Sequence, residues 1–167
     1  MLREFREHDL DDFHRMLSDP EVMAFAPTLP HDTIGQTREW LARRLTIAPG
    51  AGEDFVIEHS GRVIGKAGFP AFPEIGFLIA RDHWGKGLAA EAVEAVVDRA
   101  FTVHRLDRVL AKVDPENAAS LRLLTQIGFI ETGRQQRALL VGNEWRDDVR
   151  LELSLAEWRG RPGPDAA

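Results

Sequence analysis

The stretch that decides the fold covers residues 75–101 and reads IGFLIARDHWGKGLAAEAVEAVVDRAF. Residues 75–80 are apolar without alternation, which is typical of a strand covered on both faces. Apolar residues then recur at helical spacing across residues 88–103, with charged residues on the other side, and this pattern predicts an amphipathic helix. Between the two elements lies Trp84-Gly85-Lys86-Gly87, which combines two glycines with one positive charge.

A strand end followed by glycines and a helix start can bind an anion. The first amides of a helix have no partner within the helix, and the helix dipole adds partial positive charge there. Glycines let the backbone approach a phosphate closely, and Lys86 adds a full charge. An ordinary tight turn is the more frequent use of four such residues. The spacing matches neither a nucleoside-triphosphate loop nor the dinucleotide-binding fingerprint, which needs a third glycine.

The size and composition predict one globular domain. The chain has 167 residues, of which 44% are hydrophobic and 29% charged, and this suits a single core. We expect the domain to span residues 1–159 and the Pro- and Gly-rich residues 160–167 to form a disordered tail. Cysteine is absent, which excludes disulfides and a cysteine nucleophile. The histidines show no metal-binding spacing, so we expect no metal.

Charge and hydropathy limit the kinds of partner that the protein can bind. No apolar run reaches eighteen residues and the N-terminus does not resemble a signal peptide, so we expect a cytoplasmic protein that is not in a membrane. The net charge of −6 argues against nucleic acid, which rewards a basic surface. It is compatible with a cationic substrate such as an amine, although mild acidity also simply keeps a protein soluble.

Alternating strands and helices fill the rest of the chain. A hairpin signal at Ser60-Gly61 joins two strands, and Gly128 is a helix stop signal. Asp9 is expected to cap the first helix. The predicted strands cover residues 2–6, 55–59, 62–68, 75–80, 108–113, 129–137 and 149–154, and the predicted helices cover residues 10–17, 33–46, 88–103 and 117–126.

Three motifs in this order point to a known family. They are EIGFLIA (74–80), WGKGLAAEAV (84–93) and PENAASLRLLTQIGF (115–129). Together they resemble the GNAT superfamily of N-acetyltransferases, specifically the branch that acetylates the N-termini of ribosomal proteins. Each motif alone is weak, but three at matching spacing inside a compatible order of elements are specific. The resemblance covers nearly the whole chain, less clearly before Phe55 and after Gly142.

The resemblance implies a fold and a cosubstrate. The expected fold is a single α/β (α+β) domain with a mixed, mostly antiparallel sheet of about seven strands. The sheet is expected to splay between its fourth and fifth strands and to carry helices on both faces. The expected cosubstrate is acetyl-coenzyme A, with its pantetheine arm in the splay. A homodimer is also known among such relatives and is compatible with this sequence.

The resemblance also assigns candidate site residues. The family has Gln or Arg three positions before the first glycine, where this chain has Asp82. The amides of residues 84–89 would hold the pyrophosphate, and the edge of the fourth strand would pair with the pantetheine arm. The implied cosubstrate-binding residues are Phe77, Leu78, Ile79, Trp84, Gly85, Lys86, Gly87, Leu88, Ala89, Asn117, Ser120 and Arg122.

The reaction implied is direct attack of an amine on the thioester. An α-amine, with a pKa of about 8, is partly neutral at pH 7, whereas a lysine at about 10.4 needs more help. Glu74 is the candidate base, because it precedes the strand that would flank the thioester; an exposed strand-end charge is the plain alternative. Many relatives place a tyrosine near the sulfur. This chain has no tyrosine, so Ser120 is the candidate partner of the leaving sulfur.

Three functions compete at this point. The first is acetylation of a primary amine, with a protein N-terminal α-amine as acceptor. The second is acetylation of a small-molecule amine, such as an antibiotic or a polyamine. The third is a domain that binds acyl-coenzyme A as a sensor without catalysis.

Overall fold

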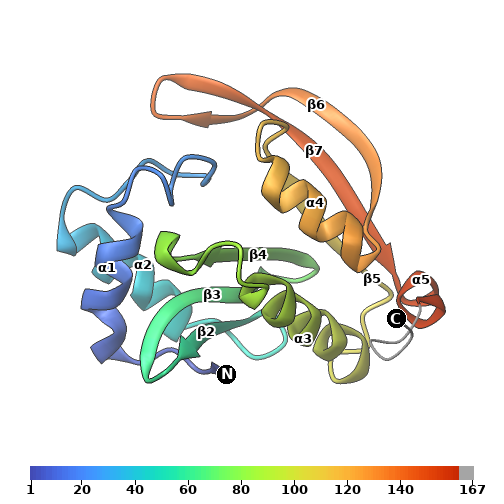
Figure 1. Ribbon diagram of the computed structural model, residues 1–167, viewed down its shortest axis with the longest axis horizontal. Helices are drawn as coiled ribbons and strands as arrows, with labels where there is room; N and C mark the ends of the chain where they lie inside the picture. Colours follow the sequence, from blue (N-terminus) through green and yellow to red (C-terminus); the bar gives the residue numbers. More distant parts are fainter. Residues whose placement is uncertain (162–167) are drawn as a thin grey trace.

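Seven strands form one sheet in the computed structural model, which describes residues 1–161 (Figure 1). The strand order is β1-β2-β3-β4-β5-β7-β6, and every neighbouring pair is antiparallel except β4 and β5. The expected α/β class and mostly antiparallel sheet are therefore confirmed. The strands are β1 (Leu2–Arg3), β2 (Glu53–His59), β3 (Arg62–Ala71), β4 (Glu74–Ile79), β5 (Arg108–Val113), β6 (Ile130–Val141) and β7 (Glu144–Ser154).

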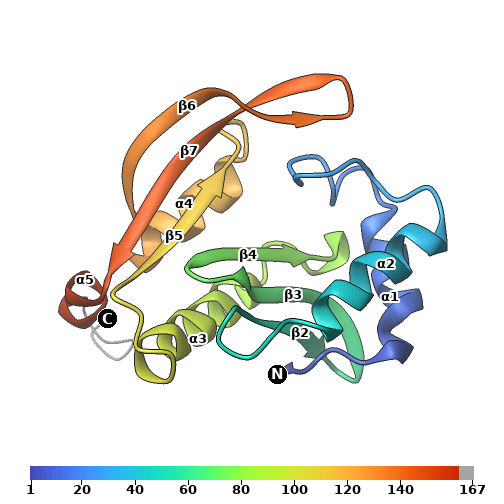
Figure 2. The same ribbon diagram turned by 180° about the vertical axis from the view of Figure 1, so that it is seen from behind.

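The sheet splits between β4 and β5. The two parallel strands share a single register pair, Glu74 with Leu110, and Figure 2 shows them diverging beyond it. One half of the molecule holds β1 to β4, and the other holds β5, β7 and β6. The predicted splay is present, and it opens toward the ends of β4 and β5.

Helices cover both faces of the sheet. The helices α1 (Leu10–Leu17) and α2 (Ile34–Leu45) pack on one face of the first half (Figures 1 and 2). On the other face α3 (Leu88–Thr102) and α4 (Ala118–Ile127) share a second core with the strands. The apolar stripe expected on α3 is buried as predicted and consists of Ala92, Val93, Val96, Val97, Ala100 and Phe101.

Several local predictions are confirmed by backbone geometry. Ser60 and Gly61 both have positive φ, 50° and 74°, as a tight hairpin turn requires. Gly128 ends α4 in the left-handed region at φ 112°. Val149, Leu151 and Leu153 alternate on one face of β7 and are all buried. Along β4, Ile75 and Ile79 are buried but Phe77 and Leu78 are only half-buried, because the strand borders the split.

The β6–β7 hairpin is longer than predicted. Its strands continue almost to the turn at Gly142, past the expected ends at residues 137 and 149. The extension of β6 is the continuous apolar run from Ala138 to Val141, and the extension of β7 is mostly polar, so neither has the apolar alternation that marks a strand. A short helix, α5 (Leu155–Gly160), was also not predicted, although Ser154 and Glu157 form a capping box at its start. Residues 162–167, most of the expected tail, lie outside the described part.

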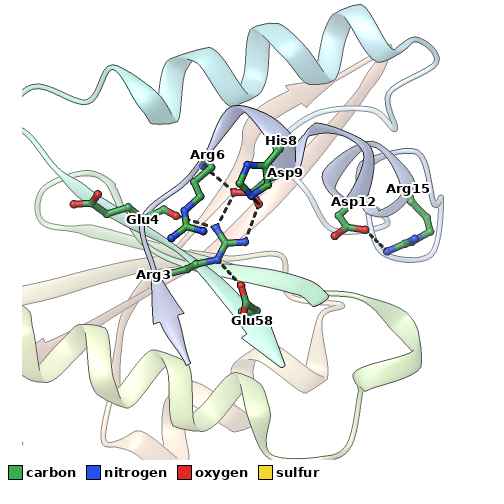
Figure 3. A network of polar contacts seen from close by, with 8 residues as sticks. All are labelled: Arg3, Glu4, Arg6, His8, Asp9, Asp12, Arg15 and Glu58. Atoms are coloured by element: carbon green, nitrogen blue, oxygen red, sulfur yellow. Dashed lines mark hydrogen bonds and ion pairs between the residues drawn. The ribbon is translucent and has the colours of Figure 1, made fainter. Parts of the chain in front are cut away.

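Asp9 is the N-cap residue of α1, as predicted, but its side chain does not make the expected capping hydrogen bond. The Asp9 carboxylate instead accepts hydrogen bonds from the Arg3 guanidinium at 2.7 and 2.9 Å and from the Arg6 backbone N–H at 2.8 Å. Arg3 also reaches Glu58 of β2, and Figure 3 shows this network. Asp9 therefore joins the short 3-10 turn η1 (Glu7–Asp9) to the edge of the sheet.

Two observations bear on metals and membranes. Among the described residues, no three His, Asp or Glu side chains are grouped so that they could hold a metal ion. Within residues 1–161, every helix is too short or too polar to cross a membrane.

Candidate functional site

The segment from β4 to α3 places two glycines in the left-handed region. Gly85 has φ 71° and Gly87 has φ 76°, where residues with a Cβ are strained. A Cβ built on either glycine would meet nothing within 4 Å. The glycines are therefore needed for their backbone conformation, and the space around them is open.

The turn leaves several amides free at the start of α3. Glu91 N–H makes the first helical hydrogen bond, to the Gly87 carbonyl at 3.1 Å. In the described part of the chain, the N–H groups of residues 85–90 donate neither to a side chain nor to a backbone oxygen outside α3. The Trp84 N–H is different, because it already donates to the Arg81 carbonyl at 3.1 Å. The free donors and the helix dipole suit an anionic group.

Side chains anchor this turn to the strand. The Trp84 indole Nε1 donates to the Ile79 carbonyl at 2.8 Å, and Lys86 Nζ donates to the Asp82 carbonyl at 2.8 Å. Asp82 itself faces His83, with 2.8 Å between Oδ1 and Nδ1. The hydrogen bond from His83 lowers the pKa of the Asp82 carboxyl. The residue that departs from the family pattern is thus paired beside the turn.

The split exposes one edge of β4. The Pro73 carbonyl accepts from the Leu110 N–H, and the Ala80 N–H donates to the Ile64 carbonyl. Since backbone groups alternate sides along a strand, odd-numbered residues of β4 turn theirs toward β5. The N–H groups of Phe77 and Ile79 therefore face the split, whereas the backbone of Leu78 faces β3, opposite Lys66.

The start of α4 brings two predicted residues to the other side of the split. Asn117 caps the helix, and its Oδ1 accepts from the Ser120 N–H at 3.1 Å. The half-buried Ser120 hydroxyl has no hydrogen-bond partner among the described residues. Arg122 is exposed and forms no ion pair within residues 1–161. Asn117 and Ser120 thus lie together at the start of α4, and Arg122 is on the solvent side of the helix.

Glu74 lies at the single register pair between β4 and β5. Its Oε2 lies 2.7 Å from Lys112 Nζ of β5, and both side chains are about half exposed, 47% and 52%. Because the pair is exposed, water also reaches this carboxylate.

A cavity of about 330 Å³ lies next to the start of α4, with Asp114 to Glu116 in its lining, and no pattern in the sequence predicted it. Three segments form it: the middle of the α1–α2 connection, the turn before Asn117 and the start of β7. Arg146 Nη1 donates to the Ala24 carbonyl at 2.6 Å and so joins two of these segments. The lining contains four carboxylates against one guanidinium: Asp114, Glu116, Glu144 and Asp147, with Arg146. These lining residues are too far apart in the sequence for any spacing pattern to group them. Only the overall acidic composition could be seen in the sequence.

A second cavity, of about 420 Å³, lies between the α1–α2 connection, α2 and the tip of the β6–β7 hairpin. Asp32 lines it, together with His31, Glu39 and Arg43. Residues between 27 and 43 and the tip of the hairpin thus enclose open space at this end of the molecule.

Comparison with known proteins gives a consistent result. The family described as "Acetyltransferase (GNAT) domain" matches residues 1–130. An uncharacterized N-acetyltransferase, p20, from Bacillus licheniformis is 34% identical over 79% of each chain. The [ribosomal protein uS5]-alanine N-acetyltransferase of Escherichia coli is 32% identical over 50% of this chain and 43% of its own.

A solved structure supports the same fold. The spermidine N-acetyltransferase of Vibrio cholerae, crystallised in complex with CoA and spermine, is similar with a TM-score of 0.81 and 22% identity. The match covers 95% of this chain and 97% of that one. At this identity the likeness shows the fold alone.

Proposed function

This chain belongs to the GNAT family of acetyltransferases, and on that premise we propose that it acetylates a primary amine with acetyl-coenzyme A, at the split between β4 and β5. The chain is an acyltransferase enzyme of the N-acetyltransferase type. The observation that carries the site assignment is the free start of α3 beside an unpaired strand edge. The branch that acts on ribosomal proteins is only one of several to which the chain is similar.

The residues present fit a coenzyme A thioester. Residues 85–89 offer free amides to a pyrophosphate, and the N–H groups of Phe77 and Ile79 offer donors to the pantetheine arm. The cosubstrate supplies an acyl group whose carbonyl an amine can attack. Glu74, at the start of the split, would accept a proton from the incoming amine directly or through water. The Ser120 hydroxyl would donate to the leaving sulfur.

The acidic cavity indicates what kind of amine enters. Four carboxylates against one guanidinium attract a substrate that carries more than one positive charge. A polyamine meets this requirement better than a protein N-terminus, which has a single amine. The N-terminal α-amine has the advantage of a pKa of about 8, so it needs less help to become neutral. We favour the polyamine on the charge of the cavity.

The test is a panel of amines with acetyl-coenzyme A, read as release of free thiol. It compares linear triamines and tetraamines, peptides that begin with alanine or serine, and simple monoamines. We expect kcat/KM to be highest for the polyamines. In the double variant Glu144→Gln/Asp147→Asn, KM for the polyamine should rise about tenfold, since each lost charge weakens attraction for a multivalent cation.

A matched control variant removes the same number of negative charges from residues outside the cavity. The double variant Asp11→Asn/Asp98→Asn removes two exposed carboxylates from α1 and α3 that do not line the cavity, and it should leave this KM within about twofold. Preference for peptides would assign the N-terminal acceptor instead. Binding of coenzyme A by calorimetry with no thiol release for any amine would favour the sensor.

A further inference from the structure

A buried ion pair lies on the face of the sheet that α1 and α2 cover. Lys66 Nζ of β3 donates to both carboxylate oxygens of Asp54 of β2, at 3.1 and 3.4 Å. The two side chains are only 8% and 0% exposed. Burying two charges is costly, and an apolar pair in their place would be as stable or more so. A role beyond stability is therefore worth seeking for this pair.

Two glycines on neighbouring strands make room for these side chains. Gly68 of β3 lies opposite Asp54 on one side and opposite Gly76 of β4 on the other. A Cβ on Gly68 would stand 2.7 Å from Asp54 Oδ1, and a Cβ on Gly76 would stand 3.3 Å from Lys66 Nζ. The ammonium group of Lys66 thus lies where a side chain at position 76 would otherwise be.

Position 76 is the place where β4 leaves β5. Glu74, two residues earlier, is the β4 residue in register with β5. Past this contact, Phe77 is the next residue with its N–H toward the split. The Gly76 carbonyl and the Phe77 N–H belong to one peptide unit. Lys66 therefore places a positive charge next to the peptide unit that carries the Phe77 N–H, the first unpaired N–H group of the β4 edge.

We propose that Lys66 is a positioning residue for acetyl transfer, whose buried ammonium stabilises the negative charge that develops on the thioester oxygen next to the Phe77 N–H. The inference rests on the proposed function, because it takes the thioester to lie against the edge of β4. The amine nitrogen bonds to the carbonyl carbon and pushes an electron pair onto the oxygen. The pair then returns, the carbon–sulfur bond breaks, the sulfur leaves as thiolate, and the surplus amine proton passes to Glu74 or water.

The physical basis is a difference between two states. A fixed positive charge interacts weakly with an uncharged carbonyl and strongly with an oxygen that carries negative charge, so it lowers the barrier rather than tightening ground-state binding. Burial strengthens the effect because little water screens it. Lys66 acts here through the Gly76–Phe77 peptide unit and has no contact with the reacting atoms.

The charge on Lys66 depends on its neighbours. Burial lowers the pKa of Lys66, Asp54 raises it, and Arg44 of α2, 3.8 Å from the same carboxylate, lowers it further, so the net direction is downward. On the neighbouring strands β4 and β5, Glu74 and Lys112 pair with each other at 2.7 Å. Lys66 should therefore lose its proton at a lower pH than a free lysine, about 10.4, and kcat should fall with it.

The experiment compares pH profiles of kcat under saturating polyamine and acetyl-coenzyme A. In the wild type, kcat should decline on the alkaline side, below the pH expected of a free lysine. In Lys66→Met, which keeps the length of the side chain, kcat should be about tenfold lower and the alkaline decline should disappear. The Kd of acetyl-coenzyme A, measured by calorimetry, should stay within about twofold.

A second variant guards against misfolding of the first. Asp54→Asn keeps Lys66 but removes the charge that favours its protonated form, so the alkaline decline should move to lower pH. A purely structural role for the pair would lower the melting temperature of both variants and leave the decline where it was. That result overturns the inference, as does a wild-type profile with no such decline, or a folded Lys66→Met with kcat within twofold of wild type. Absence of wild-type thiol release with every amine would instead overturn the proposed function.

Discussion

Glu74 lies opposite Leu110, and within residues 1–161 no other register pair joins β4 to β5. By contrast β5 pairs with β7 along its whole length, from Arg108 to Val113. The sheet therefore has an unpaired strand edge in its middle, in addition to its outer edges at β1 and β6. Unpaired backbone groups need partners, so this edge is where a cosubstrate can add hydrogen bonds.

The position of Glu74 at this junction makes its carboxylate testable as the base. Glu74→Gln removes the proton acceptor and keeps the shape, so kcat should fall about tenfold or more. Lys112→Met removes the ion-pair partner at 2.7 Å but leaves the carboxylate, and kcat should stay within about threefold. Steady-state kinetics with saturating amine checks both. If Glu74→Gln were as active as the wild type, Glu74 would not be the base but an exposed charge at the end of the strand.

Gly87 offers a test of the anion site with a matched control. Gly87→Ala should destabilise the fold by about 1 kcal/mol, because φ of 76° strains a residue with a Cβ. Gly61→Ala, at φ 74° in the β2–β3 turn, should cost the same. Neither Cβ would meet an atom within 4 Å, so strain is the whole effect on folding.

The two variants should differ in binding alone. Gly87→Ala changes the turn that presents the amides of residues 85–89, so the Kd of coenzyme A should rise about tenfold. Gly61→Ala should bind as wild type does. Denaturant melts and calorimetry on both proteins measure the two quantities. Equal Kd values would remove the amide turn from the binding site.

Ser120 can be tested against a second hydroxyl on the same helix. Ser120→Ala should lower kcat by about threefold to tenfold, since one neutral hydrogen bond to the leaving sulfur is lost. Thr125→Ala, on the exposed side of α4, should leave kcat unchanged. The cap from Asn117 is retained in both, because it is made to the backbone N–H of Ser120. Unchanged turnover in Ser120→Ala would leave the sulfur without a side-chain donor.

The Arg3–Asp9 pair predicts how stability depends on acid. Burial alone would raise the pKa of Asp9, but the hydrogen bonds from Arg3 and from the Arg6 N–H outweigh it and lower that pKa. A carboxyl with a lowered pKa stabilises the fold above its unfolded value, about 3.9, and loses this contribution as the pH falls through its folded value.

Asp9→Asn should therefore reduce the free energy of unfolding by about 2 kcal/mol at pH 7. The difference from wild type should shrink as the pH approaches 2. Urea titrations at several pH values give both numbers. A difference that stays constant from pH 7 to pH 2 would contradict the ionic origin of the effect.

Thr37 links two histidines across the first layer of helices. Its buried hydroxyl lies 2.8 Å from His14 Nδ1 and 2.9 Å from His31 Nδ1. Burial lowers the pKa of His31, and the positive charges of His14, Arg43 and Arg44 lower it further. A histidine with a lowered pKa folds best when neutral, so stability should fall as the pH drops from about 6.5 through the folded value.

The variant His31→Gln removes this titration. Its free energy of unfolding should change less between pH 7.5 and pH 5 than that of the wild type, by about 1 kcal/mol. Thr37→Ser keeps the hydroxyl and should keep the wild-type slope. Parallel slopes for wild type and His31→Gln would show that another group carries the acid sensitivity.

The sequence allowed prediction of the elements that depend on local pattern. The stripe from Ala92 to Phe101 predicted the buried face of α3, because helical periodicity and burial coincide there. Ser60-Gly61 and Gly128 predicted a turn and a helix end, because their backbone conformations have few alternatives. The Asp9 side chain does not make the expected capping bond because Arg3, six residues away and on a strand, bonds to the same carboxylate. The full length of the β6–β7 hairpin was not predicted, because the residues near its tip do not alternate between apolar and polar side chains.

The features of the candidate site also divide into those that follow from local sequence and those that depend on tertiary structure. Residue types and spacing alone determined the glycine turn at the start of α3 and the cap at Asn117, since each depends on a few consecutive residues. Only the tertiary structure decided that Glu74 meets Lys112, that Lys66 lies under Gly76, and that four carboxylates share one cavity. The Glu74–Lys112 contact and the acidic cavity join segments that are distant in the chain, whereas Lys66 reaches Gly76 across neighbouring strands of one half of the sheet. No local pattern of residues gives any of these distances, because each depends on how the strands and loops pack.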